Sequence, residues 1–186
     1  MKVERIEVKR CLVASDEGKS LGGLVEQTFQ NGFTEIEKEV LKLTEMELDN
    51  RINWRAREYD KLVWAIEERS IDDLGVWPEA GELPAEWCYG SVRDTAQCIE
   101  RALKSKKWPK ESVRGRAFKN IPFIKKNTDI LVRTRLLAPI VVPGGTHRKY
   151  PPYHLMTGDL DDGCLRAISF ALKGIEKFNV FVGTST

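Results

Sequence analysis

The chain has 186 residues, 41% of them hydrophobic and 31% charged, which is the composition of a folded globular protein with one or two small domains. A chain of this length buries enough surface to fold without disulfides or a structural metal, and its four cysteines show no zinc-ligand spacing with the two histidines. There is neither a basic leader followed by an apolar segment nor an apolar run of about 18 residues, so we expect a cytoplasmic protein with free thiols and no membrane association.

The net charge of +2 conceals a strong segregation of charge along the chain. Residues 104–150 contain 13 Lys and Arg but only 2 Asp and Glu. Cations at this density favour a polyanionic partner, either nucleic acid or a polyphosphate ligand, because each Lys or Arg that neutralises a phosphate releases a condensed counterion. The alternative is a solvated basic face that balances the acidic first half of the chain. The candidate DNA contacts are Lys106, Lys107, Arg114, Arg116, Lys119, Lys125, Lys126, Arg133 and Arg135.

The first part of the chain is predicted to form one strand and two helices. Apolar residues partly alternate with charged ones over residues 1–14, which predicts a strand with one buried face. Thr34 and Glu37 have the spacing of a capping box, so a helix is predicted over 34–49. A second helix is predicted over 54–70, where apolar residues recur at helical spacing.

The middle of the chain is predicted to contain an irregular segment followed by a third helix. Residues 71–90 are interrupted by glycines and prolines, and no regular element is expected there. Ser91 and Asp94 open a helix predicted over 91–106, because a hydroxyl and a carboxylate at this spacing satisfy the first backbone amides of a helix.

Aromatic residues interrupt the basic stretch 104–126. Trp108, Phe118 and Phe123 lie among its lysines and arginines. Cations for phosphates beside aromatic rings for base stacking are what a groove for single-stranded nucleic acid needs. Three aromatic side chains can equally pin a loop to the hydrophobic core, and both interpretations stay open.

The last third of the chain is predicted to be rich in strands. The predicted strands cover residues 130–132, 139–142, 153–156 and 178–182. A helix predicted over 162–173 ends at Gly174. Together these elements predict an α+β protein. We expect residues 1–110 to form an N-terminal strand and helical region packed on a core of residues 111–186, in one compact structural unit.

The residues best suited to binding or catalysis lie at the start of this last helix. The sequence GDLDDGCLRA, residues 158–167, places a strand, a glycine turn and a helix in succession. Free backbone amides and the positive helix end then meet at one point, where a phosphate can bind. Gly163 lets the anion approach the backbone, and Arg166 can fork onto it. The structural alternative makes Asp162 a helix N-cap, Gly163 a tight turn and Arg166 a surface ion-pair partner.

The carboxylates of Asp159, Asp161 and Asp162 at this turn would repel a phosphate unless they have other roles. One task is capping the helix, which suits Asp162. Another is holding a divalent cation such as Mg²⁺ that bridges to the phosphate oxygens, which makes Asp159 and Asp161 the candidate metal ligands. The candidate catalytic residues are therefore Asp159, Asp161, Asp162 and Arg166.

The segment PIVV…YHLMTGDLDDGCLRAISFALKG…NVFVG resembles the core of the ParB/sulfiredoxin superfamily, over about residues 120–183. The likeness consists of a Pro-Ile strand, a turn with Asp-Gly-x-x-Arg at 162–166, a helix and a short final strand. It implies a core of short mixed strands with a phosphate-facing helix. Cys164 departs from ParB-like members, which commonly carry His there, and is similar to the Gly-Cys-x-Arg arrangement of sulfiredoxins; a reactive thiolate and an inert packed cysteine are the two alternatives.

The resemblance implies phosphate chemistry on nucleotide and DNA. Members of the superfamily bind such phosphates at this helix start, so we expect a ParB-like DNase that uses Mg²⁺ or a similar divalent cation and binds or hydrolyses ATP or ADP. Small members act on plasmid DNA and inhibit fertility, which implies interference with plasmid or T-DNA transfer and contact with a DNA-transfer protein complex. The alternatives are an ATP- or ADP-dependent small-molecule kinase and a non-catalytic DNA-binding adaptor.

A basic glycine turn before the motif adds candidates for the nucleotide site. His147 in this turn can act as a general acid or base or contact a phosphate, and an exposed loop histidine is the alternative. The predicted nucleotide- and phosphate-binding residues are His147, Lys149, Gly163, Cys164 and Arg166.

Overall fold

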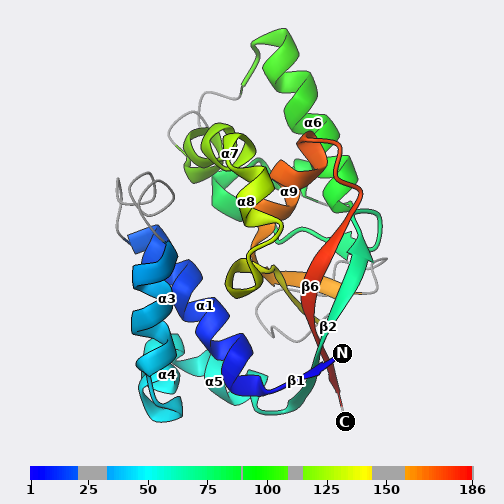
Figure 1. Cartoon of the computed structure of the whole chain (residues 1–186). Coiled ribbons are helices and arrows are strands. Elements are labelled where there is room, and N and C mark those ends of the chain that lie inside the picture. Colours follow the sequence, from blue (N-terminus) through cyan, green and yellow to red (C-terminus); the bar gives the residue numbers. More distant parts are fainter. Residues whose placement is uncertain (21–32, 89, 109–114, 144–157, 186) are drawn as a thin grey trace.

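The computed structural model describes residues 1–20, 33–88, 90–108, 115–143 and 158–185, and its central feature is a mixed sheet of six strands (Figure 1). The strand order is β1-β2-β6-β4-β5-β3. Strands β1/β2, β2/β6 and β4/β5 pair antiparallel, whereas β4/β6 and β3/β5 pair parallel. The strands are β1 (Lys2–Val3), β2 (Leu62–Ser70), β3 (Leu74–Gly75), β4 (Ile140–Val142), β5 (Gly158–Asp162) and β6 (Lys177–Ser185).

Helices pack in two groups, which Figure 1 shows as a blue-to-cyan group and a green-to-orange group. The first group is α1 (Arg5–Ser20), α3 (Phe33–Lys42), α4 (Glu45–Ile52) and α5 (Trp54–Tyr59), and the second is α6 (Val92–Ser105), α7 (Arg116–Lys126), α8 (Thr128–Leu131) and α9 (Cys164–Leu172). Each face of the sheet has its own hydrophobic core, the first core on the face of the first helix group and the second core on the face of the second helix group. Successive side chains of a strand point to opposite faces, so Ile140 and Val142 of β4 lie in the first core and Val141 lies in the second. The sheet therefore lies between two hydrophobic cores.

The predicted strand over residues 1–14 is wrong, because only Lys2–Val3 pairs in the sheet and a helix begins at Arg5. Val8, Cys11, Leu12 and Ser15 are all buried, and their spacing is that of one helix face. The apolar–charged alternation at the very start of the chain covers too few residues to outweigh this longer helical pattern.

The helix predicted over 34–49 is two helices, α3 and α4, separated at Leu43 and Thr44. Thr44 has extended backbone and forms a capping box with Glu47, in which each residue satisfies a backbone amide of the other. This local signal begins a new helix. The capping box predicted for Thr34 falls on a side chain outside the described residues.

The helix predicted over 54–70 is wrong beyond Tyr59. Residues 62–70 form β2, which pairs with β6 along its whole length, from Leu62 opposite Ser185 to Ser70 opposite Lys177. The helical spacing of apolar residues here is coincidental, because the backbone hydrogen bonds go to a strand more than a hundred positions away in sequence.

The remaining predicted helices and strands agree with the structure only in part. The capped helix at Ser91 and Asp94 is confirmed as α6, and the predictions of β4, α9 and β6 are confirmed within a few residues at their ends. Residues 71–90 contain the short β3 and two 3₁₀ turns. The strand predicted over 130–132 is wrong, because the segment belongs to the short helix α8 and the turn after it. The strand predicted over 153–156 lies outside the described residues.

The coarse class predicted from sequence, α+β, agrees with eight α-helices and a mixed sheet in the described part of the chain. All four cysteines are free. Among the described helices none is both long and apolar enough to cross a membrane.

Candidate functional site

A single residue joins β5 to α9. Gly163 follows the last strand residue, has a φ of +88°, and is the N-cap of the helix without any side-chain cap. A Cβ at this position would lie 2.9 Å from the Cβ of Pro139 and 3.0 Å from Nη2 of Arg166, so the junction accepts only glycine without distortion. The prediction that Asp162 caps the helix is therefore wrong, since the chain has already reached Gly163 where the helix begins.

Asp162 instead holds the guanidinium of Arg166. Arg166 Nη2 donates to Asp162 Oδ2 at 2.6 Å, and Nη1 donates to Ser15 Oγ of α1 at 2.8 Å. Arg166 is only 9% exposed, so this is a buried ion pair rather than a surface contact. The sequence predicted a role for Asp162 and Arg166 but not for Ser15, which reaches them from the opposite end of the chain.

Asp161 has separate partners from the first helix group. Its side chain is fully buried, it accepts a hydrogen bond from the Tyr59 hydroxyl, and Arg55 Nε lies 3.4 Å from its Oδ1. Burial raises the pKa of Tyr59 well above its ordinary value, and the negative charge of Asp161 raises it further. Burial alone would lower the pKa of Arg55, but the negative charges around it, that of Asp161 foremost, together outweigh burial and raise the pKa overall.

We call the group Arg55, Tyr59, Asp161, Asp162 and Arg166 the junction cluster. It combines two guanidinium groups with two carboxylates where β5 meets α9. In the described part of the chain the buried Nε atoms of Arg55 and Arg166 make no hydrogen bond, although Arg55 Nε forms the ion pair with Asp161. Buried donors of this kind are rare in folded proteins, and a guanidinium N–H is well suited to a phosphate oxygen.

An exposed tryptophan stands next to the cluster. Trp54 is 55% exposed, and the guanidinium of Arg55 lies over its ring, 5.3 Å from the centroid. The Arg55 side chain is 26% exposed and that of Arg166 is 11% exposed, so Arg55 is the more accessible of the two arginines. The sequence pattern predicts neither Trp54 nor Arg55 as a site residue.

The predicted metal ligands have different surroundings. Asp159 and Asp161 alternate onto the same face of β5, but Asp159 is half-buried and Asp161 is enclosed. The Asp161 carboxylate is already held by a hydroxyl and a cation, which does not fit a metal ligand. Within the described ranges, no group of three or more His, Cys, Asp and Glu is placed to hold a metal ion.

The remaining predicted phosphate-binding residues are only partly described. Cys164 is the first residue of α9, is half-buried, and lies with its Sγ 3.6 Å from the carbonyl oxygen of Leu160. His147 and Lys149 lie outside the described residues.

The predicted DNA contacts largely keep their charges exposed. In the described part of the chain no carboxylate lies within ion-pair distance of seven of them, namely Lys106, Lys107, Arg116, Lys119, Lys125, Lys126 and Arg133. Six of the seven are exposed and Lys125 is half-buried. Arg135 forms an ion pair with Glu7, and Arg114 is outside the described residues.

The aromatic residues of the basic stretch have a structural role in part. Trp108 packs edgewise against Trp87 and Phe118, with ring centroids 5.6 and 5.2 Å apart. Trp108 and Phe123 are partly buried against the second core, as expected of residues that pin the chain, whereas Phe118 is 37% exposed.

No protein-family model, curated protein or solved structure matches this chain. The resemblance to the ParB/sulfiredoxin superfamily therefore stays a prediction from the motif at 162–166.

Proposed function

We propose that the protein acts on the phosphate groups of DNA and nucleotides, as a DNase that also binds or hydrolyses ATP, and that the junction cluster is its active site. The observation that carries this proposal is that Asp161 and Asp162, adjacent at the end of β5 and beside the start of α9, each pair with a guanidinium group whose buried Nε makes no hydrogen bond in the described part of the chain. A phosphate oxygen would satisfy those donors and also face the positive end of the helix.

The residues divide into binding and positioning roles. Arg55, the more exposed arginine, would meet the phosphate first, and Arg166 would bind it as well. Asp161 and Asp162 are positioning residues, since each holds one guanidinium in place. In phosphodiester hydrolysis water attacks phosphorus and the ester P–O bond breaks, while the guanidinium groups offset the charge that develops on the phosphoryl oxygens.

Surfaces next to the cluster suit the rest of a nucleic acid. The indole of Trp54, exposed beside Arg55, offers a face for a base or an adenine ring. The exposed cations of α7, above all Arg116, Lys119 and Lys126, offer contacts for flanking phosphates. The superfamily resemblance supports the same chemistry, and it extends the proposal to interference with plasmid or T-DNA transfer.

The experiment follows nicking of a supercoiled plasmid by purified protein, with Mg²⁺ or EDTA and with or without ATP. We expect Arg55→Gln and Arg166→Gln to lower the nicking rate by about 10²–10³-fold, because each removes a cation from the developing charge. Arg69→Gln is the matched control, since Arg69 pairs with Glu67 on β2 and belongs to no part of the cluster. Circular dichroism confirms that each variant is folded.

A second candidate function is a non-catalytic DNA-binding adaptor. The burial of Arg166 and its bonds to Ser15 and Asp162 favour it, because a guanidinium held on two sides also serves as a structural tie between α1 and α9. Plasmid that is retained by the protein but never nicked, under any combination of metal and ATP, would establish the adaptor and reject the enzyme.

A further inference from the structure

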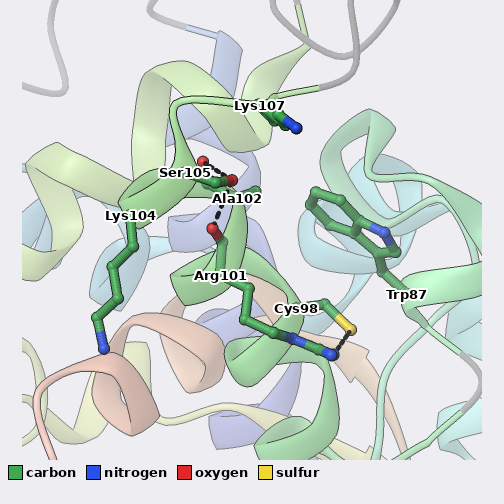
Figure 2. Close-up of a pocket in the computed structure, with 7 residues that line it drawn as sticks. All are labelled: Trp87, Cys98, Arg101, Ala102, Lys104, Ser105 and Lys107. Carbon is green, nitrogen blue, oxygen red and sulfur yellow. Dashed lines mark hydrogen bonds between the residues drawn. The ribbon is translucent and has the colours of Figure 1, made fainter.

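A groove lies between Trp87 and the C-terminal half of α6 (Figure 2). It is an open surface groove with a volume of about 740 Å³. The lining residues are Trp87, Cys98, Arg101, Ala102, Lys104, Ser105 and Lys107. None of them belongs to the junction cluster, so an inference about this groove goes beyond the proposed function.

The charge of the groove is positive. Arg101 donates from Nη2 to Cys98 Sγ at 3.2 Å and from Nε to the carbonyl oxygen of Gln97 at 3.3 Å, so its charge is not offset by those partners. Lys104 is 73% exposed and pairs with Glu100, a surface ion pair that holds it only weakly. In the described part of the chain no carboxylate pairs with Arg101 or Lys107.

An aromatic ring forms one wall of the groove. Figure 2 shows the indole of Trp87 across the groove from Cys98 and Arg101 of α6, whereas the side chain of Lys104 extends away from the indole. Trp87 is half-buried, and Trp108 packs against it edgewise at an interplanar angle of 81°. Because its neighbour already fixes the indole, stacking on Trp87 needs little additional ordering of the side chain.

We propose that this groove binds a single strand of nucleic acid, with one base stacked on Trp87, the adjacent phosphates on Arg101 and Lys107, and a phosphate farther along the strand on Lys104. An aromatic face beside a row of cations is the combination by which proteins bind single strands without sequence preference. A duplex keeps its bases stacked on each other and cannot offer one to the indole. An acidic peptide would use the cations but has no base to stack.

The test measures fluorescence anisotropy of a labelled oligothymidylate of about 12 nucleotides, in EDTA so that binding is followed without cleavage. We expect the double variant Lys104→Ala/Lys107→Ala to reduce the slope of log affinity against log salt by about 1.4, the value for two lost phosphate contacts on a single strand. Lys38→Ala/Lys42→Ala is the matched control, because it also removes two exposed lysines, here from α3. The control should leave the slope unchanged.

A second set of variants tests the indole. Trp87→Leu should weaken binding by roughly tenfold or more, and Trp87→Phe should restore most of the affinity, because phenylalanine keeps an aromatic face. Trp87 also packs against Trp108, so thermal unfolding of both variants is measured alongside. The lysine variants change exposed side chains and test the groove independently of any effect on the fold.

Three outcomes would overturn the inference: an unchanged salt slope in the Lys104/Lys107 variant, equal competition by a duplex of the same length, or equal displacement by a polyglutamate peptide. The last would assign the groove to an acidic protein instead. If the protein binds the oligonucleotide but never nicks plasmid, the groove is supported and the proposed enzyme is rejected. If it nicks plasmid but does not bind the oligonucleotide, the enzyme is supported and the groove is rejected.

Discussion

Gly163 shows how one residue sets the direction of a guanidinium. Its left-handed backbone turns the chain from β5 into α9 without an intervening loop, and this brings Asp162 and Arg166 of adjacent elements to 2.6 Å. Pro139 lies against the same glycine, so the turn has no room for a side chain. The contact between strand end and helix start is therefore a consequence of having no Cβ at this position.

We expect Gly163→Ala to lower the free energy of unfolding by about 1–3 kcal/mol more than Gly174→Ala. Both glycines have positive φ, +88° and +79°, but a Cβ at Gly174 meets no atom within 4 Å. The comparison therefore separates the cost of the clash with Pro139 and Arg166 from the cost of the backbone conformation. Urea unfolding of the two variants measures it. Equal losses would show that the junction relaxes to accept a methyl group.

At the scale of elements, one buried lysine connects the helices of the first group. Lys9 of α1 is fully buried, and its Nζ lies 2.6 Å from Asp49, 2.8 Å from Asp60 and 3.1 Å from Glu45. Burial alone would lower the pKa of Lys9, but hydrogen bonds to the three carboxylates outweigh it and raise the pKa overall. Arg5 first and Lys9 second hold the pKa of Glu45 below its ordinary value. Charge pairing thus fixes α1 against α4 and the end of α5.

Lys9→Met is expected to cost roughly 2 kcal/mol of unfolding free energy at neutral pH, because it leaves partly buried carboxylates without their cation. The lowered pKa of Glu45 means that its contribution is present above its ordinary value of 4.5 and is lost as pH falls through the folded-state pKa. The difference between wild type and variant should therefore shrink in acid. Urea unfolding at neutral and acidic pH measures this. Lys61→Met, at a lysine 66% exposed, is the control and should cost little at either pH.

At the scale of the whole molecule, the sheet makes two cores depend on each other. Phe181 of β6 lies in the first core, while its neighbours Val180 and Val182 lie in the second. The strand cannot leave one core without leaving the other, and both terminal regions of the chain contribute strands to the same sheet. We therefore expect the described elements to unfold as one cooperative unit.

Phe181→Ala should lower the free energy of unfolding by about 3–5 kcal/mol, because it opens a cavity at a fully buried position. Far-ultraviolet circular dichroism and tryptophan fluorescence should report one coincident transition in wild type and variant, since Trp64 lies in the first core and Trp87 packs against the second. Phe118→Ala, at a residue 37% exposed, should cost much less. Two separate transitions in the variant would mean that the cores unfold independently.

The sequence by itself determined the elements whose signals are local. The capping box at Ser91 begins α6, the buried run at 140–142 forms β4, and Gly174 with its positive φ follows α9. The same local pattern at 162–166 located Asp162, Gly163 and Arg166 at one junction. These predictions succeeded because caps, turn glycines and strand-to-helix transitions depend on neighbours a few residues away.

Only the tertiary structure decided which distant residues complete the candidate site and where β2 lies. Residues 62–70 have helical spacing but pair with β6, a partner far along the chain that no local pattern can indicate. Ser15, Arg55 and Tyr59 reach Arg166 and Asp161 from α1 and α5, so their proximity exists only once both cores have formed. Hydrogen bonds and charge pairing act through space, and a residue's partners are therefore set by the packing of whole elements rather than by its neighbours in sequence.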